Sequence, residues 1–399
     1  MLGGMADAAD RPLWTGDFIR LCVFYFGVFL LGYPLLPIVP LHLRGLGAGL
    51  AESGRFVSAF TVGSAVGCLV MGPLGDRLGQ RRVMRSASFA MVGFLAAYAV
   101  LPWRAAFLLL APLNGLVWSG LRTAAVARAG TILPDAHRAQ GMSFFGLASP
   151  AGIAVGPLLG LGLLPLLGHR ALLLGLALGF LGLAFLVRPE RAQASGMTPH
   201  ALLPALPEAW ILLPASALFL MGMSYGPIPP FAAQEARLLH LPWSSALLSS
   251  LALGMVGLRL LLGVTGMGRR PVALLLPMAL LSAFGMAALA LLPGGLLRHA
   301  SGGALYGAGF ALFHTLVFMH VMEAGDPARR GAAVGALYFS YDAGQAAGSF
   351  LLGLTMEHAG RLGGAAAGFR WGWGAAALLL GVSALLAWRI QRPRPRASA

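Results

Sequence analysis

Four ionisable side chains lie inside apolar stretches of the sequence, and their positions predict one shared depth. Arg122, Arg259, His314 and Asp342 each fall roughly 8–11 residues from the same predicted end of a helix, or about 12–17 Å at the α-helical rise. A charge at the centre of a lipid bilayer costs at least about 2.5–3.5 kcal/mol, so each should be paired or face water. These residue types favour ion pairing and proton transfer.

Each of the four residues is expected to have its own role. Arg259 and Asp342 should form an ion pair between two helices, which could be either a structural brace or part of the site. Arg122 has no acid at its level in the first half of the chain, so it should face a cavity and attract an anionic group. Asp342 is the best proton-carrier candidate, and His314 is the second because histidine titrates near neutral pH.

Other polar or amphipathic residues are predicted at the same depth. They are Tyr33, Asn114, Trp118, Tyr225, Tyr338, Tyr341 and Gln345. Each could bind a ligand in a shared cavity, or could pack between helices. Cys22 and Cys68 also lie in apolar stretches, and two such thiols give neither a disulfide framework nor a metal-binding spacing. We expect no metal and no cofactor.

The elements that hold these residues are predicted from composition. Of 399 residues, 58% are hydrophobic and only 10% charged, which excludes a soluble enzyme, a nucleic-acid-binding domain and a disordered chain. The remaining class is an all-α membrane protein with 12 transmembrane helices. The predicted segments are 18–40, 52–74, 84–102, 104–131, 138–167, 169–187, 209–231, 243–267, 271–292, 298–323, 331–357 and 370–390.

The arginines predict the orientation of these segments. With the N-terminus inside, 18 arginines fall on the cytoplasmic side and 8 on the outer side, as the positive-inside rule requires. Both termini are therefore expected in the cytoplasm of a multi-pass protein of the cell membrane, with a bacterial inner membrane as the favoured setting. The net charge of +15 then describes topology, and no nucleic-acid partner is expected.

An offset of 192 residues relates the two halves of the sequence. It pairs Tyr33 with Tyr225, Arg122 with His314, and the glycines 115, 152 and 156 with glycines 307, 344 and 348. This duplication predicts two six-helix bundles, residues 1–187 and 209–399, joined by a cytoplasmic linker at 188–208. Halves related by an axis along the membrane normal are a known transporter plan, with substrate bound between them.

The segment between the second and third predicted helices carries a compact motif of glycines and charges. Its residues are Gly72, Gly75, Asp76, Arg77, Gly79, Arg81 and Arg82. The motif resembles the signature loop of the major facilitator superfamily, although Gly75 and Gln80 depart from it. The resemblance implies that small residues bring helices 2 and 11 together. It also implies that Asp76 helps to latch the cytoplasmic side, by accepting hydrogen bonds from the start of helix 11 or pairing with loop arginines.

A second motif lies in the fifth predicted helix, at Gly152, Gly156, Pro157 and Gly160. It resembles the Gly-x-x-x-Gly-Pro motif of proton-driven antiporters within the same superfamily. The alternative is ordinary close packing along a glycine stripe. Ala111 stands where those antiporters carry an arginine, which weakens the antiporter assignment.

These features together predict a secondary transporter of the major facilitator type and not an enzyme. The expected activity is export of a small organic molecule, either an anionic or zwitterionic metabolite or a drug, by proton antiport with rocker-switch alternating access. The expected partners are the substrate, protons and the lipid bilayer, and the protein is expected to be a monomer. The alternatives are a proton-coupled uptake symporter, and a non-transporting receptor or assembly factor on the same fold.

Overall fold

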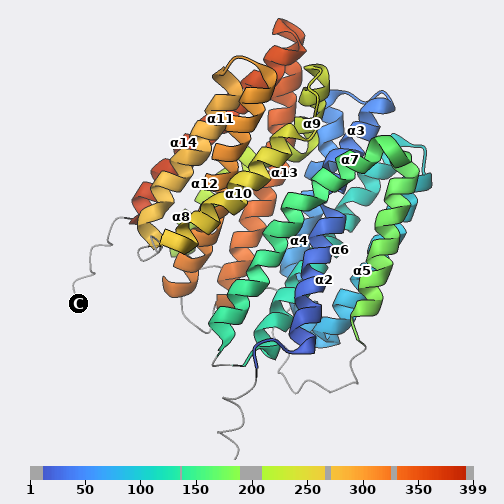
Figure 1. The fold of residues 1–399 in the computed structure, drawn as a ribbon, viewed down its shortest axis with the longest axis vertical. Helices are drawn as coiled ribbons and strands as arrows, with labels where there is room; N and C mark the ends of the chain where they lie inside the picture. Colours follow the sequence, from blue (N-terminus) through green and yellow to red (C-terminus); the bar gives the residue numbers. More distant parts are fainter. Residues whose placement is uncertain (1–11, 135–136, 189–208, 266–270, 325–329, 392–399) are drawn as a thin grey trace, which may run out of the picture.

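The computed structural model describes residues 12–134, 137–188, 209–265, 271–324 and 330–391, and these are almost entirely helical (Figure 1). The first half contains α2 (Gly16–Gly32), α3 (Leu35–Gly45), α4 (Leu50–Leu78), α5 (Gln80–Val100), α6 (Arg104–Ile132) and α7 (Arg138–Leu186). The second half contains α8 (Leu212–Tyr225), α9 (Ile228–Leu238), α10 (Ala246–Thr265), α11 (Leu275–Leu291), α12 (Gly295–Ala324), α13 (Arg330–Gly363) and α14 (Ala365–Gln391). Short 3₁₀ turns, η2 (Ala209–Ile211) and η4 (Pro271–Leu274), precede α8 and α11.

Every predicted segment overlaps a described helix, and among the described residues eight helical stretches are long and apolar enough to cross a membrane. An all-helical membrane fold is therefore confirmed, while the number of crossings stays a prediction. In Figure 1 the blue-to-green helices α2–α7 and the yellow-to-red helices α8–α14 lie on opposite sides of the molecule. The helix pair α4 and α13 packs along the interface between them.

The first helix of each half is broken within one residue of the same position of the repeat. Tyr33 and Pro34 separate α2 from α3, and Gly226 and Pro227 separate α8 from α9. Proline lacks the N–H that continues a helix, and its ring clashes with the preceding turn. Tyr33 lies in the first break, and Tyr225 is the last residue before the second.

The long helix α7 contains the boundary expected between segments 138–167 and 169–187. Gly168 adopts φ 72° and ψ 171°, which is outside the helical region. Glycine adopts a positive φ at little steric cost because it lacks a Cβ atom. Thus α7 is two helices that meet at Gly168.

Glycine-mediated contacts recur in both halves, as the duplication predicts. A Cβ atom on Gly115 would lie 1.8 Å from the carbonyl oxygen of Phe60, so α6 touches the backbone of α4. The repeat mate Gly307 packs α12 on α10 in the same way, 2.1 Å from the Leu251 carbonyl oxygen. Small residues at a helix interface let two backbones approach closely.

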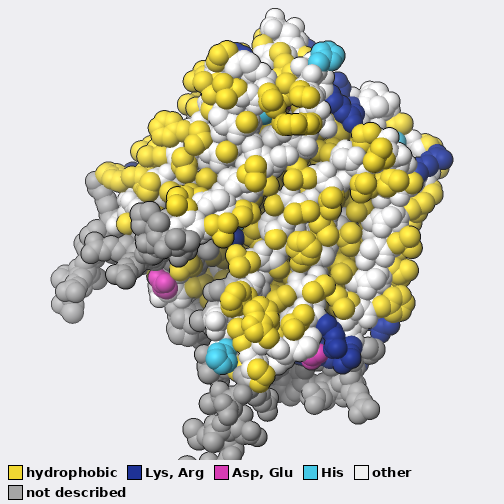
Figure 2. Space-filling model, in the orientation of Figure 1, with side chains coloured by type: hydrophobic (Ala, Val, Ile, Leu, Met, Phe, Trp, Pro, Cys, Tyr) yellow, Lys and Arg dark blue, Asp and Glu magenta, His cyan; other side chains and the backbone are white. Residues whose placement is uncertain are grey.

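The outer surface of the helices carries large apolar side chains (Figure 2). Five leucines on five helices are 68–77% exposed: Leu109, Leu178, Leu253, Leu291 and Leu378. Soluble monomers rarely expose apolar patches of this extent, whereas lipid solvates them. The composition that excludes a soluble protein therefore corresponds to a lipid-facing surface.

Replacing Gly115 with Ala should destabilise the protein, because the added methyl group would overlap the backbone of α4. We expect a loss of about 1–3 kcal/mol in the free energy of unfolding, seen as a lower thermal midpoint in detergent. The matched control is Gly93→Ala, since a Cβ atom at Gly93 meets nothing within 4 Å. A midpoint for Gly115→Ala equal to that of Gly93→Ala would contradict the close contact.

Candidate functional site

An ion pair joins the two halves at the centre of the helix bundle. Arg122 of α6 donates to Asp342 of α13 at 2.6 Å, and the two side chains are only 12% and 2% exposed. Ser64 of α4 donates to the same carboxylate oxygen at 2.7 Å and accepts from Arg122 at 2.9 Å. Cys68, one turn further along α4, contacts both charged groups. A buried charge pair requires such additional hydrogen bonds to offset its desolvation.

The expected ion pair between Arg259 and Asp342 is wrong. Arg259 of α10 donates to the Ala311 carbonyl oxygen at 3.2 Å and to the Thr315 hydroxyl at 2.9 Å, both on α12. The position of a residue in the sequence indicates its depth along a helix, but not the neighbouring helix towards which its side chain points. The sequence therefore does not indicate which of the two arginines faces α13. Arg259 therefore braces two helices of the second half, while Arg122 takes the acid of the opposite half.

A small cavity adjoins the Arg122–Asp342 pair. Its volume is about 20 Å³, room for about one water molecule. The residues that line it are Gly32, Tyr33, Leu36, Phe60, Thr61, Ser64, Trp118, Arg122, Asp342 and Gln345. Gln345 donates to Asp342 at 3.3 Å, and Tyr33 lies 5.9 Å from Trp118 between ring centroids. Of the predicted residues, Tyr33, Trp118, Arg122, Asp342 and Gln345 thus meet in one place.

An aromatic cluster continues from this cavity into the second half. His314 lies against Tyr341 and Phe318, with ring centroids 5.0 and 4.8 Å apart, and Tyr225 stacks on Phe310 at 4.9 Å. Tyr338 connects the two regions, since the Arg122 guanidinium lies 5.6 Å above its ring. His314 and its repeat mate Arg122 therefore lie near the same tyrosine, and His314 is surrounded by rings.

Asn114 does not line this cavity, which agrees with the packing alternative for this residue. Its side chain is fully buried and donates to the Tyr98 hydroxyl of α5 at 3.4 Å. The residue shares its depth with the site but lies on the face of α6 that packs inside the first half. Packing is therefore the observed role of Asn114.

The glycine stripe of the fifth predicted helix packs α7 against the first helix. Cβ atoms on Gly152, Gly156 and Gly160 would lie within 2.6–2.7 Å of atoms in α2, or of Pro34 beyond its end. Gly344 and Gly348 pack α13 on α8 more closely still, at 2.1 and 2.0 Å from carbonyl oxygens of α8. Because the stripe recurs at the repeat position, close packing explains it in both halves, and Pro157 lies within the same stretch of α7.

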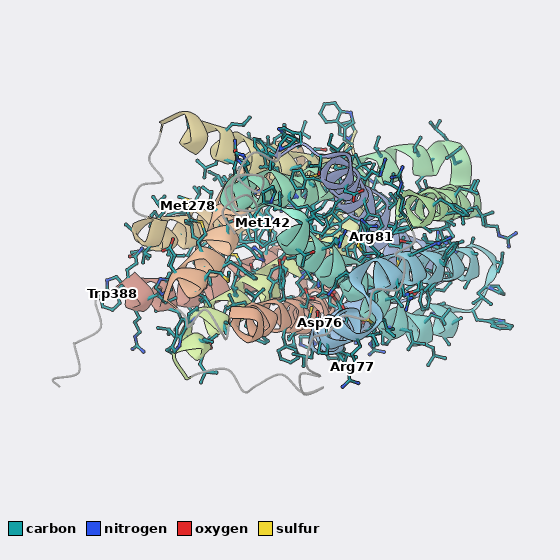
Figure 3. The ribbon with its side chains drawn as sticks, turned by 90° about the horizontal axis from the view of Figure 1, so that it is seen from below. Asp76, Arg77, Arg81, Met142, Met278 and Trp388 are labelled. Carbon is teal, nitrogen blue, oxygen red and sulfur yellow. The ribbon has the colours of Figure 1, made fainter. Side chains whose placement is uncertain are left out.

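The signature loop lies at the predicted cytoplasmic end of the bundle, where Figure 3 labels Asp76, Arg77 and Arg81. Asp76 accepts a hydrogen bond from Gln80 at 3.0 Å, and a Cβ atom on Gly75 would meet the same glutamine. Arg81 pairs with Asp17 of α2 at 3.0 Å and not with Asp76, while Arg82 is exposed. Residues 325–329, before α13, lie outside the described residues, so the latch stays a prediction.

The second and eleventh predicted helices correspond to α4 and α13. These two helices do approach each other closely, but not at the glycine of the signature motif. A Cβ atom on Gly72 would meet nothing within 4 Å, whereas Gly54 of α4 lies against Phe231 and the Ser349 carbonyl oxygen. The Ser349 hydroxyl donates to the Gly54 carbonyl oxygen at 3.0 Å, and Gln234 of α9 donates to Ser53 at 3.0 Å. These bonds join the halves at the predicted outer end.

An open cavity of about 680 Å³ lies beyond these contacts at the predicted outer end. Its lining includes three arginines, Arg44, Arg237 and Arg361, and one acid, Glu357. Glu357 accepts from the Ala51 backbone N–H at 2.8 Å, which adds another bond between the halves. The cavity is therefore basic in character and bounded by the contact between α4, α9 and α13.

A second buried charge cluster was not predicted from the sequence. Glu235 of α9 is fully buried and accepts from Arg298 and His299 of α12 and, at 2.8 Å, from the Trp373 indole N–H of α14. Sequence reasoning counted Arg298 among the loop arginines because it lies near a helix end. Glu235 lies four residues beyond the predicted segment 209–231, so it had the appearance of a loop residue as well. Ser64 and Cys68 were missed because small residues suit plain packing.

The comparisons with known proteins agree with this architecture. The family model of the Major Facilitator Superfamily matches residues 21–349. The chain belongs to this superfamily. It is thus a multi-pass membrane protein, and the resemblance seen in the signature loop is confirmed.

Two curated relatives are transporters. The chain is 30% identical over 234 residues to a gallate transporter of Pseudomonas putida. These aligned residues make up 57% of this chain and 46% of that protein. It is 30% identical over 171 residues to a staphyloferrin B transporter of Staphylococcus aureus, covering 42% and 39%. The matched stretches therefore span less than half the length of these relatives.

Solved structures share the fold over nearly the whole chain. The nucleoside transporter NupG superposes with a TM-score of 0.71 at 16% identity, covering 94% of this chain and 99% of its own. The human organic anion transporter MFSD10 gives 0.68 at 20% identity, covering 94% and 100%. The expectation that the chain is not an enzyme agrees with all four similarities.

Replacing Glu235 with Gln should cost about 3–5 kcal/mol in the free energy of unfolding, because Arg298 would stay buried without its counter-charge. The matched control is Glu52→Gln, whose partner Arg104 is 43% exposed, and which should cost under about 1 kcal/mol. Thermal unfolding in detergent measures both. Equal midpoints for the two variants would contradict a stabilising role for the buried cluster.

Proposed function

We propose that this chain transports a small organic anion and couples its movement to a proton on Asp342. The observation that carries the proposal is the Arg122–Asp342 ion pair across the two halves. Its position beside a cavity at the interface is where superfamily transporters are expected to bind substrate. Rocker-switch movement of the halves would then expose this site to each side in turn.

Competition for Arg122 supplies the coupling. While Asp342 is ionised it occupies the guanidinium, so a substrate carboxylate would have to displace it. A proton on Asp342 removes the negative charge and leaves Arg122 free to bind the substrate. The substrate anion and the proton should therefore bind together and cross the membrane in the same direction.

The cavity walls favour a substrate that carries an aromatic or other flat apolar part. Tyr33, Phe60 and Trp118 surround the charged pair, and Tyr338 lies under Arg122. Aromatic faces stack on planar rings and on guanidinium groups. Similarity to a gallate transporter agrees with an acidic aromatic substrate.

Export by proton antiport is the second candidate. The feature in its favour is the resemblance of Gly152, Gly156 and Pro157 to the motif of proton-driven antiporters, although close packing alone also accounts for the two glycines. Antiport would arise if the substrate took the place of the proton at Asp342, as a cationic or zwitterionic molecule could. The sign of the coupling therefore depends on which member of the ion pair the substrate contacts.

Replacing Asp342 with Asn should separate binding from coupling. In proteoliposomes tested with gallate and a panel of aromatic carboxylates, we expect proton-driven accumulation to fall by at least about tenfold, because the residue can no longer exchange a proton. Exchange of labelled for unlabelled substrate should persist, since Arg122 remains available. Arg122→Ala should lose both activities.

The control for these variants is Glu52→Gln, which removes a carboxylate far from the pair and should leave both assays unchanged. If Asp342→Asn accumulated substrate at the rate of the unaltered protein, the proposal that Asp342 carries the proton would be wrong.

The direction of coupling can be read from loaded vesicles. With the outside acidic, co-transport predicts that external substrate accumulates inside, whereas antiport predicts that internal substrate leaves faster. The inside-out and right-side-out populations are distinguished by trypsin access to Arg392, Arg394 and Arg396, which follow α14 in the sequence and are predicted to be cytoplasmic. Binding without flux in either arrangement would favour the receptor alternative.

A further inference from the structure

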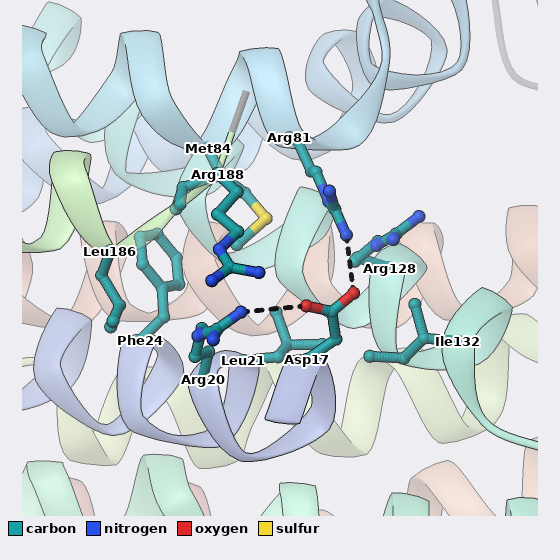
Figure 4. A pocket seen from close by; sticks show the side chains of 11 residues that line it. Asp17, Arg20, Leu21, Phe24, Arg81, Met84, Arg128, Ile132, Leu186 and Arg188 are labelled. Atoms are coloured by element: carbon teal, nitrogen blue, oxygen red, sulfur yellow. Dashed lines mark hydrogen bonds and ion pairs between the residues drawn. The ribbon is translucent and has the colours of Figure 1, made fainter. Parts of the chain in front are cut away.

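A basic pocket lies at the predicted cytoplasmic end of the first half, away from the Arg122–Asp342 pair. Four arginines and one acid line it: Arg20 of α2, Arg81 of α5, Arg128 of α6, Arg188 after α7, and Asp17 of α2. Figure 4 shows the four guanidinium groups around the single carboxylate. Asp17 contacts Arg20 at 3.3 Å and Arg81 at 3.0 Å.

The lining residues carry a formal charge of +3, since one carboxylate faces four guanidinium groups. The acid is 47% exposed and holds two of the arginines, which leaves their remaining N–H groups available to a second anion. Guanidinium groups bind phosphate oxygens through paired hydrogen bonds. The polar rim of the pocket therefore fits a phosphate group.

The floor of the same pocket is apolar. It is formed by Leu21, Phe24, Met84, Ile132, Leu186 and Val187. The pocket is open to the surface, and its cavity volume is about 40 Å³. A charged rim above an apolar floor is an amphipathic site, and a free inorganic anion would leave that floor without a partner.

Two exposed aromatic residues lie on the outer surface of two helices that line the pocket. Phe89 of α5 and Phe185 of α7 are 40% and 66% exposed, and their rings meet edge to face at 5.9 Å. Neither ring lines the pocket, and the Arg85 guanidinium lies 5.8 Å over the Phe89 ring. An acyl chain whose phosphate reaches the arginines would leave the pocket towards this lipid-facing surface, where Phe185 is the more exposed ring.

We propose that this pocket binds the phosphate headgroup of an anionic membrane phospholipid. Basic pockets between helices on the cytoplasmic side attract such headgroups, and each arginine near the surface contributes to the affinity. The lipid would connect α2, α5, α6 and the end of α7. It would hold Arg81 of the signature loop without contacting the second half.

The test uses the full chain in detergent micelles titrated with dioleoylphosphatidylglycerol. Bound lipid is counted by native mass spectrometry, and the thermal midpoint is followed in parallel. Dioleoylphosphatidylcholine tests the need for net negative charge, and inorganic phosphate tests a free anion. We expect phosphatidylglycerol to bind and raise the midpoint, and the other two to have little effect.

Arg188→Ala should weaken phosphatidylglycerol binding about fivefold, and Arg81→Ala with Arg188→Ala about 25-fold. Arg188 is exposed, so its removal should leave the fold intact even if Arg81→Ala perturbs the loop. The matched control is Arg82→Ala, because Arg82 neighbours Arg81 but does not line the pocket.

Three results would overturn the proposal. Equal weakening by Arg82→Ala would show attraction to general surface charge, and equal stabilisation by inorganic phosphate would assign the pocket to a free anion. Equal binding of phosphatidylcholine would remove the role of the net charge. Loss of transport in Asp342 variants bears on none of these, so the two proposals can fail separately.

Discussion

The structure depends on keeping opposite charges paired inside an apolar medium. Arg122 and Asp342 belong to different halves, so each half alone would carry an unpaired charge near its centre. Ser64 contacts both groups and ties α4 to the same point. The ion pair therefore stabilises the contact between the halves, and neutralising Asp342 would weaken that stabilisation.

Around this pair, both halves use the same packing device. Glycines at 115 and 307 bring helix backbones into contact, and glycines at 156 and 348 do so for a second pair of helices. These contacts leave little freedom within each half. The interface between the halves combines one such glycine contact, Gly54 on Phe231, with hydrogen bonds such as Gln234 to Ser53 and Ser349 to Gly54.

The sequence allowed the fold and several residues of the central cluster to be predicted, but not how these residues pair. Arg122 and Asp342 stand out because charges are costly in apolar helices. Their pairing depends on how α13 is rotated against α4 and α6, and spacing along one helix carries no such information. Glu235 and Arg298 were missed for another reason: near helix ends, a charge that faces the interior has the same sequence signature as one that faces water.

The small size of the central cavity has a consequence for affinity. The space beside Asp342 holds about one water molecule, so a ring-bearing molecule cannot enter until the helices around it separate. The work of that separation is subtracted from whatever the substrate gains at Arg122. A measured dissociation constant for the substrate would therefore contain two free energies. One is the cost of separating the helices around the cavity, and the other is the gain from the contacts that the substrate makes at Arg122.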